Sequence, residues 1–267
     1  MPVYERISVI VSLTLVGLAL YFVLQFPAQT ITFDLFGSPL SLNSPHQWLM
    51  ILVLAGLVMA GTDTVIRAHP ALPDRRLSYM APFWMLPGLE VVLATQILGL
   101  APTLTLWIAG LGIVGLWLWL TIIAGYHQVS CQPGTFHWTY LWHQFSGYAV
   151  VLSLFLVIYQ TRSRSALSAT GILLVSGMGA LALLRQPPES ISKTWLYAGV
   201  IALSLGQLTW ALNYWRVSTL QAGLLLLIVF YVMTGLAQQQ LLGRLSRRTL
   251  WEFGLVALAS LVLIFRI

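Results

Sequence analysis

The residues of this sequence that could do chemistry are few, and four of them lie close together along the chain. Asp63 and Arg67 are four residues apart, so that they share one face of a helix, and His69 follows them. Glu90 lies inside an apolar run, where an ionisable group costs about 2.5 kcal/mol or more and indicates a functional site. Asp63, Arg67, His69 and Glu90 are therefore a candidate polar cluster at the cytoplasmic membrane interface.

Each of these residues also has a purely structural interpretation. Asp63 and Arg67 neutralise each other near a helix end, and Pro70 stops the helix just after His69. Glu90 follows Pro87 by three residues, so its carboxylate could instead lie near lipid head groups or accept a backbone N–H. The sequence leaves both interpretations open.

Three histidines near the middle of the chain form a second candidate site. The neutral imidazoles of His127, His137 and His143 could ligate the metal of a haem or a chlorin, and Cys131 follows His127 by four residues. However, His137 and His143 are six residues apart, which places them on different sides of one helix. No standard zinc spacing is present, so we predict no metal-ion site. Histidines at a membrane interface are also common as simple hydrogen-bonding groups.

Several familiar catalytic patterns are missing from the sequence. It has no His-Glu-x-x-His pair, no Gly-x-Ser-x-Gly elbow and no phosphate-binding glycine loop. It has only seven acidic residues, most of them in connections, so a cation-coupled transport path has few groups to use. These observations argue against an enzyme and against ion-coupled transport.

The composition indicates that lipid surrounds the protein. Of 267 residues, 58% are hydrophobic and 7% are charged, whereas a globular protein has about a quarter charged residues. The net charge of +6 does not point to nucleic acid, because the arginines lie at the ends of apolar runs as membrane anchors do. The predicted partner is the lipid bilayer.

We predict an all-α polytopic transmembrane bundle of about nine helices that forms one integral membrane domain over residues 1–267. Apolar runs of about 17–25 residues match the hydrocarbon core of a bilayer. The predicted spans are residues 7–26, 47–66, 82–100, 103–123, 140–160, 166–184, 195–214, 220–241 and 250–265.

Two further features concern the connections. Alternating residues at 31–36 and 40–42 flank Gly37, Ser38 and Pro39, which predicts a small external β-hairpin between the first two helices. With nine crossings and a cytoplasmic N-terminus, nine Lys and Arg residues lie on the cytoplasmic side and four on the other side. A re-entrant third or fourth segment would reduce this bias. We therefore predict a bacterial cytoplasmic membrane protein with its N-terminus inside.

Small residues predict where helices approach each other closely. Ala198, Ala202 and Gly206 recur every four residues in the seventh span, and Gly56 with Ala60 does the same in the second. Such stripes allow helix backbones to approach, which we interpret as packing within the bundle rather than as a dimer interface.

The sequence also resembles an uncharacterised family of bacterial multi-pass membrane proteins. The likeness covers most of the layout of the chain, including the hairpin before the second helix, although its motifs are short. It implies a domain of unknown function in the bacterial inner membrane and transfers no catalytic residues. The motifs that carry it are residues 61–63, 66–70, 84–87 and 159–168.

Three functions are compatible with these observations. The first, which we favour, is a non-enzymatic accessory, scaffold or assembly subunit of a membrane complex, because no charged residue occurs between Glu90 and Arg162 and the intervening helices offer apolar surface to other subunits. The second is a pigment- or haem-binding subunit that uses His127, His137 or His143. The third is a membrane enzyme or lipid transporter whose site lies around Glu90 and Asp63.

Overall fold

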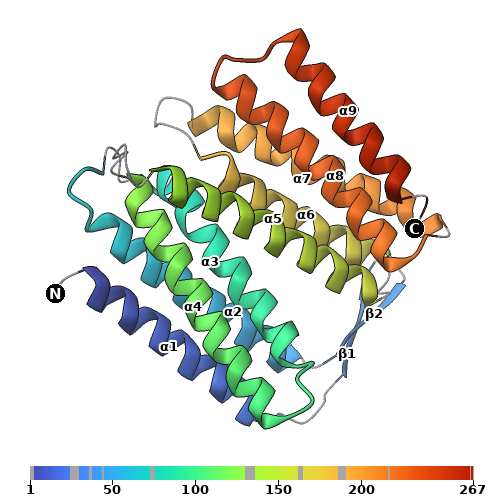
Figure 1. Cartoon of the computed structure of the whole chain (residues 1–267). Coiled ribbons are helices and arrows are strands. Elements are labelled where there is room, and N and C mark those ends of the chain that lie inside the picture. The colour runs from blue at the N-terminus through green and yellow to red at the C-terminus, as the bar shows by residue number, and fades with distance from the viewer. Residues whose placement is uncertain are drawn as a thin grey trace.

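Apolar runs become helices in the computed structural model, because a helix satisfies its backbone hydrogen bonds internally even in lipid (Figure 1). The structure describes residues 3–24, 30–35, 38–43, 45–72, 76–129, 136–161, 165–185, 191–215, 217–264 and 266. Within these residues the helices are α1 (Val3–Val23), α2 (Pro45–Arg67), α3 (Leu77–Leu98), α4 (Leu104–Val129), α5 (Phe136–Gln160), α6 (Ser165–Leu183), α7 (Ile191–Tyr214), α8 (Thr219–Leu241) and α9 (Arg247–Ile264).

Two strands lie between α1 and α2 at the end of the bundle away from the N-terminus (Figure 1). They are β1 (Thr30–Leu35) and β2 (Ser38–Asn43), and they pair antiparallel. Thr30 lies opposite Asn43, and Leu35 lies opposite Ser38. We refer to this end of the molecule as the strand end and to the other as the N-terminal end.

Eight of the described helices, α1 to α8, are long and apolar enough to cross a membrane. The helix of the ninth predicted span does not meet this standard. This helix, α9, begins with Arg247 and Arg248, and Glu252 follows within the second turn. Arg248 Nε donates to Glu252 Oε1 at 2.9 Å on an exposed surface. In the bundle, α9 lies at the edge beside α8 (Figure 1).

The third helix starts five residues before the predicted span and runs unbroken through both of its prolines. Pro82 has no N–H, so the carbonyl of Ser78 loses its usual partner within the helix. The indole Nε1–H of Trp195 on α7 donates to that carbonyl at 3.0 Å. A contact from a distant helix thus compensates for the proline and lets α3 begin at Leu77.

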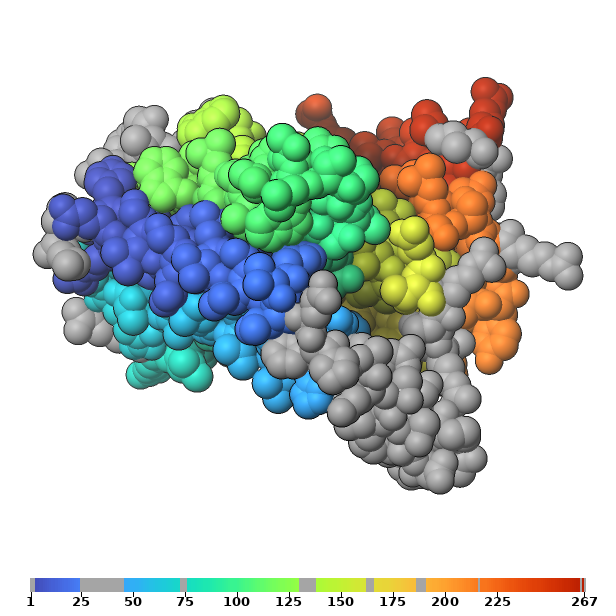
Figure 2. Space-filling view, turned by 90° about the horizontal axis from the view of Figure 1, so that it is seen from below, coloured from blue at the N-terminus to red at the C-terminus, as the bar shows by residue number. Residues whose placement is uncertain are grey.

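The same helix is the centre of the bundle. Residues of α3 belong both to the core formed with α1, α2 and α4 and to the core formed with α5 to α8. In its most apolar 18-residue window, 72% of the residues of α3 are buried, against 22% for α1 and for α4. The latter two lie side by side on one face of the molecule (Figure 2). Side chains of α3 are therefore enclosed by protein, whereas α1 and α4 face the surroundings.

The predicted small-residue stripe on α7 is confirmed, and the one on α2 is wrong. Ala198, Ala202 and Gly206 are buried in the contact between α6 and α7. In contrast, Gly56 and Ala60 are exposed, and no atom lies within 4 Å of a Cβ built on Gly56. The contact between α1 and α2 instead forms one residue further along, where Gly61 faces Ile10.

Candidate functional site

Glu90 lies near the middle of α3 and is 6% exposed. This excludes the interpretation in which its carboxyl stays among lipid head groups. Gly88, two residues earlier, has Met59 of α2 directly against it, so this part of α3 packs closely on α2. The carboxyl of Glu90 points instead toward α4 and α5, which supply its hydrogen-bond partners.

One carboxyl oxygen of Glu90 is held by two hydroxyl groups. Thr121 of α4 and Ser146 of α5 each donate to Oε1 at 2.7 Å. Indole groups orient these hydroxyls in turn, since Trp117 Nε1 donates to Ser146 Oγ at 2.8 Å and Trp142 Nε1 donates to Thr121 Oγ1 at 3.3 Å. The other oxygen, Oε2, is buried and has no hydrogen-bond partner among the described residues.

A cavity of about 250 Å³ lies beside this carboxyl, between α3, α4 and α5. Apart from Glu90 and Ser153, the residues that line it are apolar or aromatic. Ile97 and Ile113 at its edge are 50% and 62% exposed, so the cavity reaches the outer surface of the helices. In a membrane, an apolar chain could extend from it into the bilayer, whereas a polar group inside it would meet Glu90. We call this space the Glu90 cavity.

The structure separates the other predicted members of the polar cluster from Glu90. Asp63 pairs with Arg67 at the end of α2, as the spacing predicted. Met59 of α2 lies against Gly88 of α3. From this contact, Asp63 lies one turn along α2 in one direction, and Glu90 lies two residues along α3 in the opposite direction. At a rise of 1.5 Å per residue, Asp63 and Glu90 are about 9 Å apart along the helix axes. The four residues thus form two sites rather than one polar cavity.

His69 stabilises the turn that follows α2. Its Nδ1 accepts the backbone N–H of Ala71 at 3.1 Å, and its ring packs on Tyr126 with the centroids 4.5 Å apart. Burial lowers the pKa of His69, and the neighbouring His127 adds to this effect. A neutral ring with its proton on Nε2 fits these contacts, which assign His69 a structural role.

Two of the three candidate cofactor ligands, His127 and His143, can be placed, and they lie on different helices. His127 lies at the end of α4 near His69, and the side chains of His137 and Cys131 lie outside the described residues. His143 of α5 is 5% exposed, and its Nε2 bonds to the carbonyl of Ala182 at 3.1 Å. A carbonyl only accepts, so this nitrogen carries the proton and is not available as a ligand. No group of three or more His, Cys, Asp or Glu that could hold a metal ion occurs among the described residues.

The bond from His143 is one of three that satisfy the last carbonyls of α6. Helix ends leave such carbonyls without partners inside the helix. Gln238 Nε2 of α8 donates to Leu183 O at 2.9 Å, and Thr194 Oγ1 of α7 donates to Leu184 O at 3.5 Å. Three neighbouring helices therefore cap α6, which gives Nε2 of His143 a structural role, whereas its Nδ1 is buried without a hydrogen-bond partner among the described residues.

Arg185 is a half-buried cation whose position the sequence did not indicate. It follows α6 and donates to Gln128 Oε1 at 2.6 Å and to Pro82 O at 3.3 Å, while its guanidinium lies 4.0 Å from the centroid of the Phe83 ring. Burial lowers the pKa of Arg185 to about 9, so the group stays charged at neutral pH. Sequence reasoning counted the arginines at the ends of apolar runs as membrane anchors, and only the partners of Arg185 on α3 and α4 show that its guanidinium packs against the bundle.

The fold and site define a multi-pass helical membrane protein with a buried acidic group at mid-helix. The chain belongs to the family described as "Protein of unknown function (DUF5656)", which matches residues 26–267. This agrees with the resemblance to an uncharacterised family. Comparisons with curated proteins and with solved structures found no match.

Proposed function

We propose that this protein binds a membrane amphiphile in the Glu90 cavity, with an ammonium head group against Glu90 and an apolar chain along α3, α4 and α5. The observation that supports this most directly is the buried Oε2 of Glu90, which has no partner among the described residues. Its companion oxygen is already held by Thr121 and Ser146. The free oxygen is thus the one position of this carboxyl that a ligand can occupy.

The energetics favour a cationic head group. A buried acceptor without a partner costs about 1–3 kcal/mol, and a buried charge without a counter-charge costs more. An ammonium group supplies both the missing donor and the opposite charge. The Trp117 ring lines the same cavity, and a cation near such a ring gains about 0.5–2 kcal/mol.

The remainder of the cavity suits an alkyl chain. Leu93, Val114 and Val150 supply apolar walls, and burial of apolar surface contributes about 25 cal/mol per Å². The volume of about 250 Å³ is slightly below that of typical ligand pockets. We therefore expect it to hold the head group and the first part of a chain, with the rest of the chain in the bilayer.

Binding of three probes with the same chain tests this proposal. Dodecylamine, dodecanol and dodecanoate would be titrated into the purified protein in nanodiscs of zwitterionic lipid. We expect dodecylamine to bind at least about tenfold more tightly than dodecanoate, because only the amine can donate a charge-assisted hydrogen bond to Glu90. Glu90→Gln retains the shape and an acceptor for the two hydroxyls, so it should remove this preference without unfolding the protein.

Glu252→Gln is the matched control, because Glu252 is an exposed acid on α9 that lies away from the Glu90 cavity. It should leave the preference for the amine unchanged. Equal binding of the amine and the carboxylate to the wild-type protein would refute the proposal. So would a Glu90→Gln variant that still prefers the amine.

A second candidate is the role of an accessory subunit in a larger membrane complex, for which α4 provides a specific observation. Gly112 is exposed near the middle of α4 and has no atom within 4 Å of its Cβ position. Ile108 and Leu116, one turn to either side, are 56% and 60% exposed. A small residue between two larger ones offers a notch for a helix of another protein. Gly112→Leu should then abolish co-purification of a partner from native membranes, and a partner that is retained would contradict this role.

A further inference from the structure

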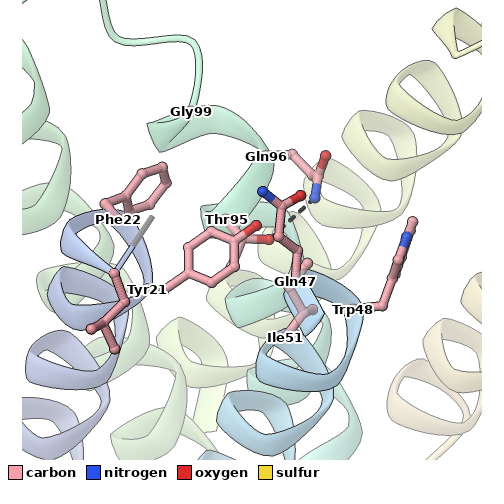
Figure 3. Close-up of a pocket in the computed structure, with 9 residues that line it drawn as sticks. Tyr21, Phe22, Gln47, Trp48, Ile51, Thr95, Gln96 and Gly99 are labelled. Carbon is pink, nitrogen blue, oxygen red and sulfur yellow. Dashed lines mark hydrogen bonds between the residues drawn. The ribbon is translucent and has the colours of Figure 1, made fainter. Parts of the chain in front are cut away.

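A second cavity, of about 470 Å³, lies at the strand end of the bundle, between α1, α2 and α3. The last turn of α1 contributes Tyr21 and Phe22, and the first turn of α2 contributes Gln47 and Trp48. The end of α3 contributes Thr95 and Gln96. Figure 3 shows these side chains around a common space, with the Tyr21 hydroxyl and the Gln47 amide directed toward each other. We call it the strand-end cavity.

The described residues that line this cavity are a mixture of polar and apolar side chains, and none of them is charged. Gln96 Nε2 donates to Thr95 Oγ1 at 3.2 Å, which leaves the carbonyl oxygen of the Gln96 amide for a ligand. No hydrogen bond between described residues engages the Gln47 amide. Amide groups both donate and accept, so they match the hydroxyl groups of a sugar or polyol, which also do both. An anionic ligand would find no counter-charge among the described residues that line the cavity.

Aromatic rings supply the second part of the recognition surface. The Trp48 side chain is 54% exposed at the cavity, and Tyr21 and Phe22 lie edge to face with their centroids 5.0 Å apart. Tyrosine and tryptophan present an apolar body together with a polar tip, and they gather where membrane meets water. Flat apolar rings beside amides suit a sugar ring, which has C–H groups on its faces and hydroxyls around its edge.

The depth of the cavity is consistent with this kind of ligand. Its lining comes from the ends of three helices that are each long enough to span the hydrocarbon core. The cavity therefore lies at the level of the lipid head groups, whereas the Glu90 cavity lies at mid-helix. Its volume falls within the range of about 300–1,000 Å³ that is typical of ligand pockets.

We propose that the strand-end cavity binds a neutral polyhydroxyl group, namely a sugar ring presented either as the head group of a glycolipid or as a free saccharide. Gln47 and Gln96 hydrogen bond to its hydroxyls, and Trp48 covers one face of the ring. This site is separate from the proposed amphiphile site, because Glu90 does not line it.

Native mass spectrometry of the full-length protein tests this inference. The probes are a monoglucosyl diacylglycerol, a phosphatidylglycerol with the same acyl chains, and maltose as a competitor. We expect the glycolipid to be retained at least about tenfold more than the phospholipid, and Gln47→Leu combined with Gln96→Leu to reduce its retention about tenfold. Displacement by maltose would assign the site to sugars in general, whereas a glycolipid that resists maltose would assign it to the lipid-bound head group.

Gln160→Leu is the matched control, since Gln160 is an exposed glutamine at the end of α5 that does not line the cavity. It should retain the glycolipid as the wild-type protein does, and circular dichroism would verify that all variants are folded. Equal retention of the two lipids would overturn the inference. So would a folded double variant that retains the glycolipid at the wild-type level.

Discussion

Replacement of both His143 and Gln238 by leucine is expected to lower the free energy of unfolding by about 2–5 kcal/mol. Each substitution removes a donor from a carbonyl at the end of α6 and leaves that carbonyl without the partner that it has among the described residues. A buried polar group that loses its partner costs about 1–3 kcal/mol, and the two sites belong to one cap. Equilibrium unfolding in mixed micelles, followed by circular dichroism, would measure the change.

Gln240→Leu provides the comparison for this pair, because Gln240 is exposed on the same helix as Gln238. Its stability should lie within about 0.5 kcal/mol of the wild-type value, as is usual for surface substitutions. If the double variant were as stable as Gln240→Leu, water rather than protein would satisfy the end of α6. The structural role assigned to His143 would then be wrong.

The number and type of the helices could largely be predicted, because hydrocarbon thickness sets the length of an apolar run. Two differences from the predicted spans have separate physical causes. Three charged residues in the first turns of α9 make it a poor spanning helix, which the apolar second half of that run concealed. Near the true start of α3, Trp195 donates to the carbonyl of Ser78, and these residues are 117 positions apart. No local pattern reveals such a contact.

In the candidate site, too, contacts within one helix could be predicted from the sequence, whereas contacts between helices could not. The pair Asp63 and Arg67 was predictable because residues four apart meet on one helix face. Glu90 was identified because an ionisable residue inside an apolar run is rare. Its partners Thr121 and Ser146 were not identified, since they lie 31 and 56 residues away on other helices. Arg185 was missed because its partners lie on α3 and α4 rather than among its neighbours in the sequence.

The position of the neighbouring helix explains why the stripe of small residues predicted a contact correctly on α7 and wrongly on α2. A stripe of small residues permits a close contact but does not create one, so the neighbouring helix decides its role. Gly206 has the Leu173 Cβ at 3.2 Å and the carbonyl of Ala169 at 3.5 Å from its own Cβ position. Gly56 has nothing there. The first is therefore a site of contact between α6 and α7, and the second faces outward.

Gly206→Leu is accordingly expected to destabilise the protein by about 1–3 kcal/mol, because the added side chain would meet the side chain of Leu173 and the backbone of α6. The same unfolding experiment would measure the loss. Gly199→Leu on the same helix is the matched control, since no atom lies within 4 Å of its Cβ position. It should leave stability unchanged or raise it slightly, because glycine weakens a helix by about 1 kcal/mol relative to alanine. Only Gly206→Leu should thus lower stability, and equal losses of stability would show that α6 and α7 do not pack through Gly206.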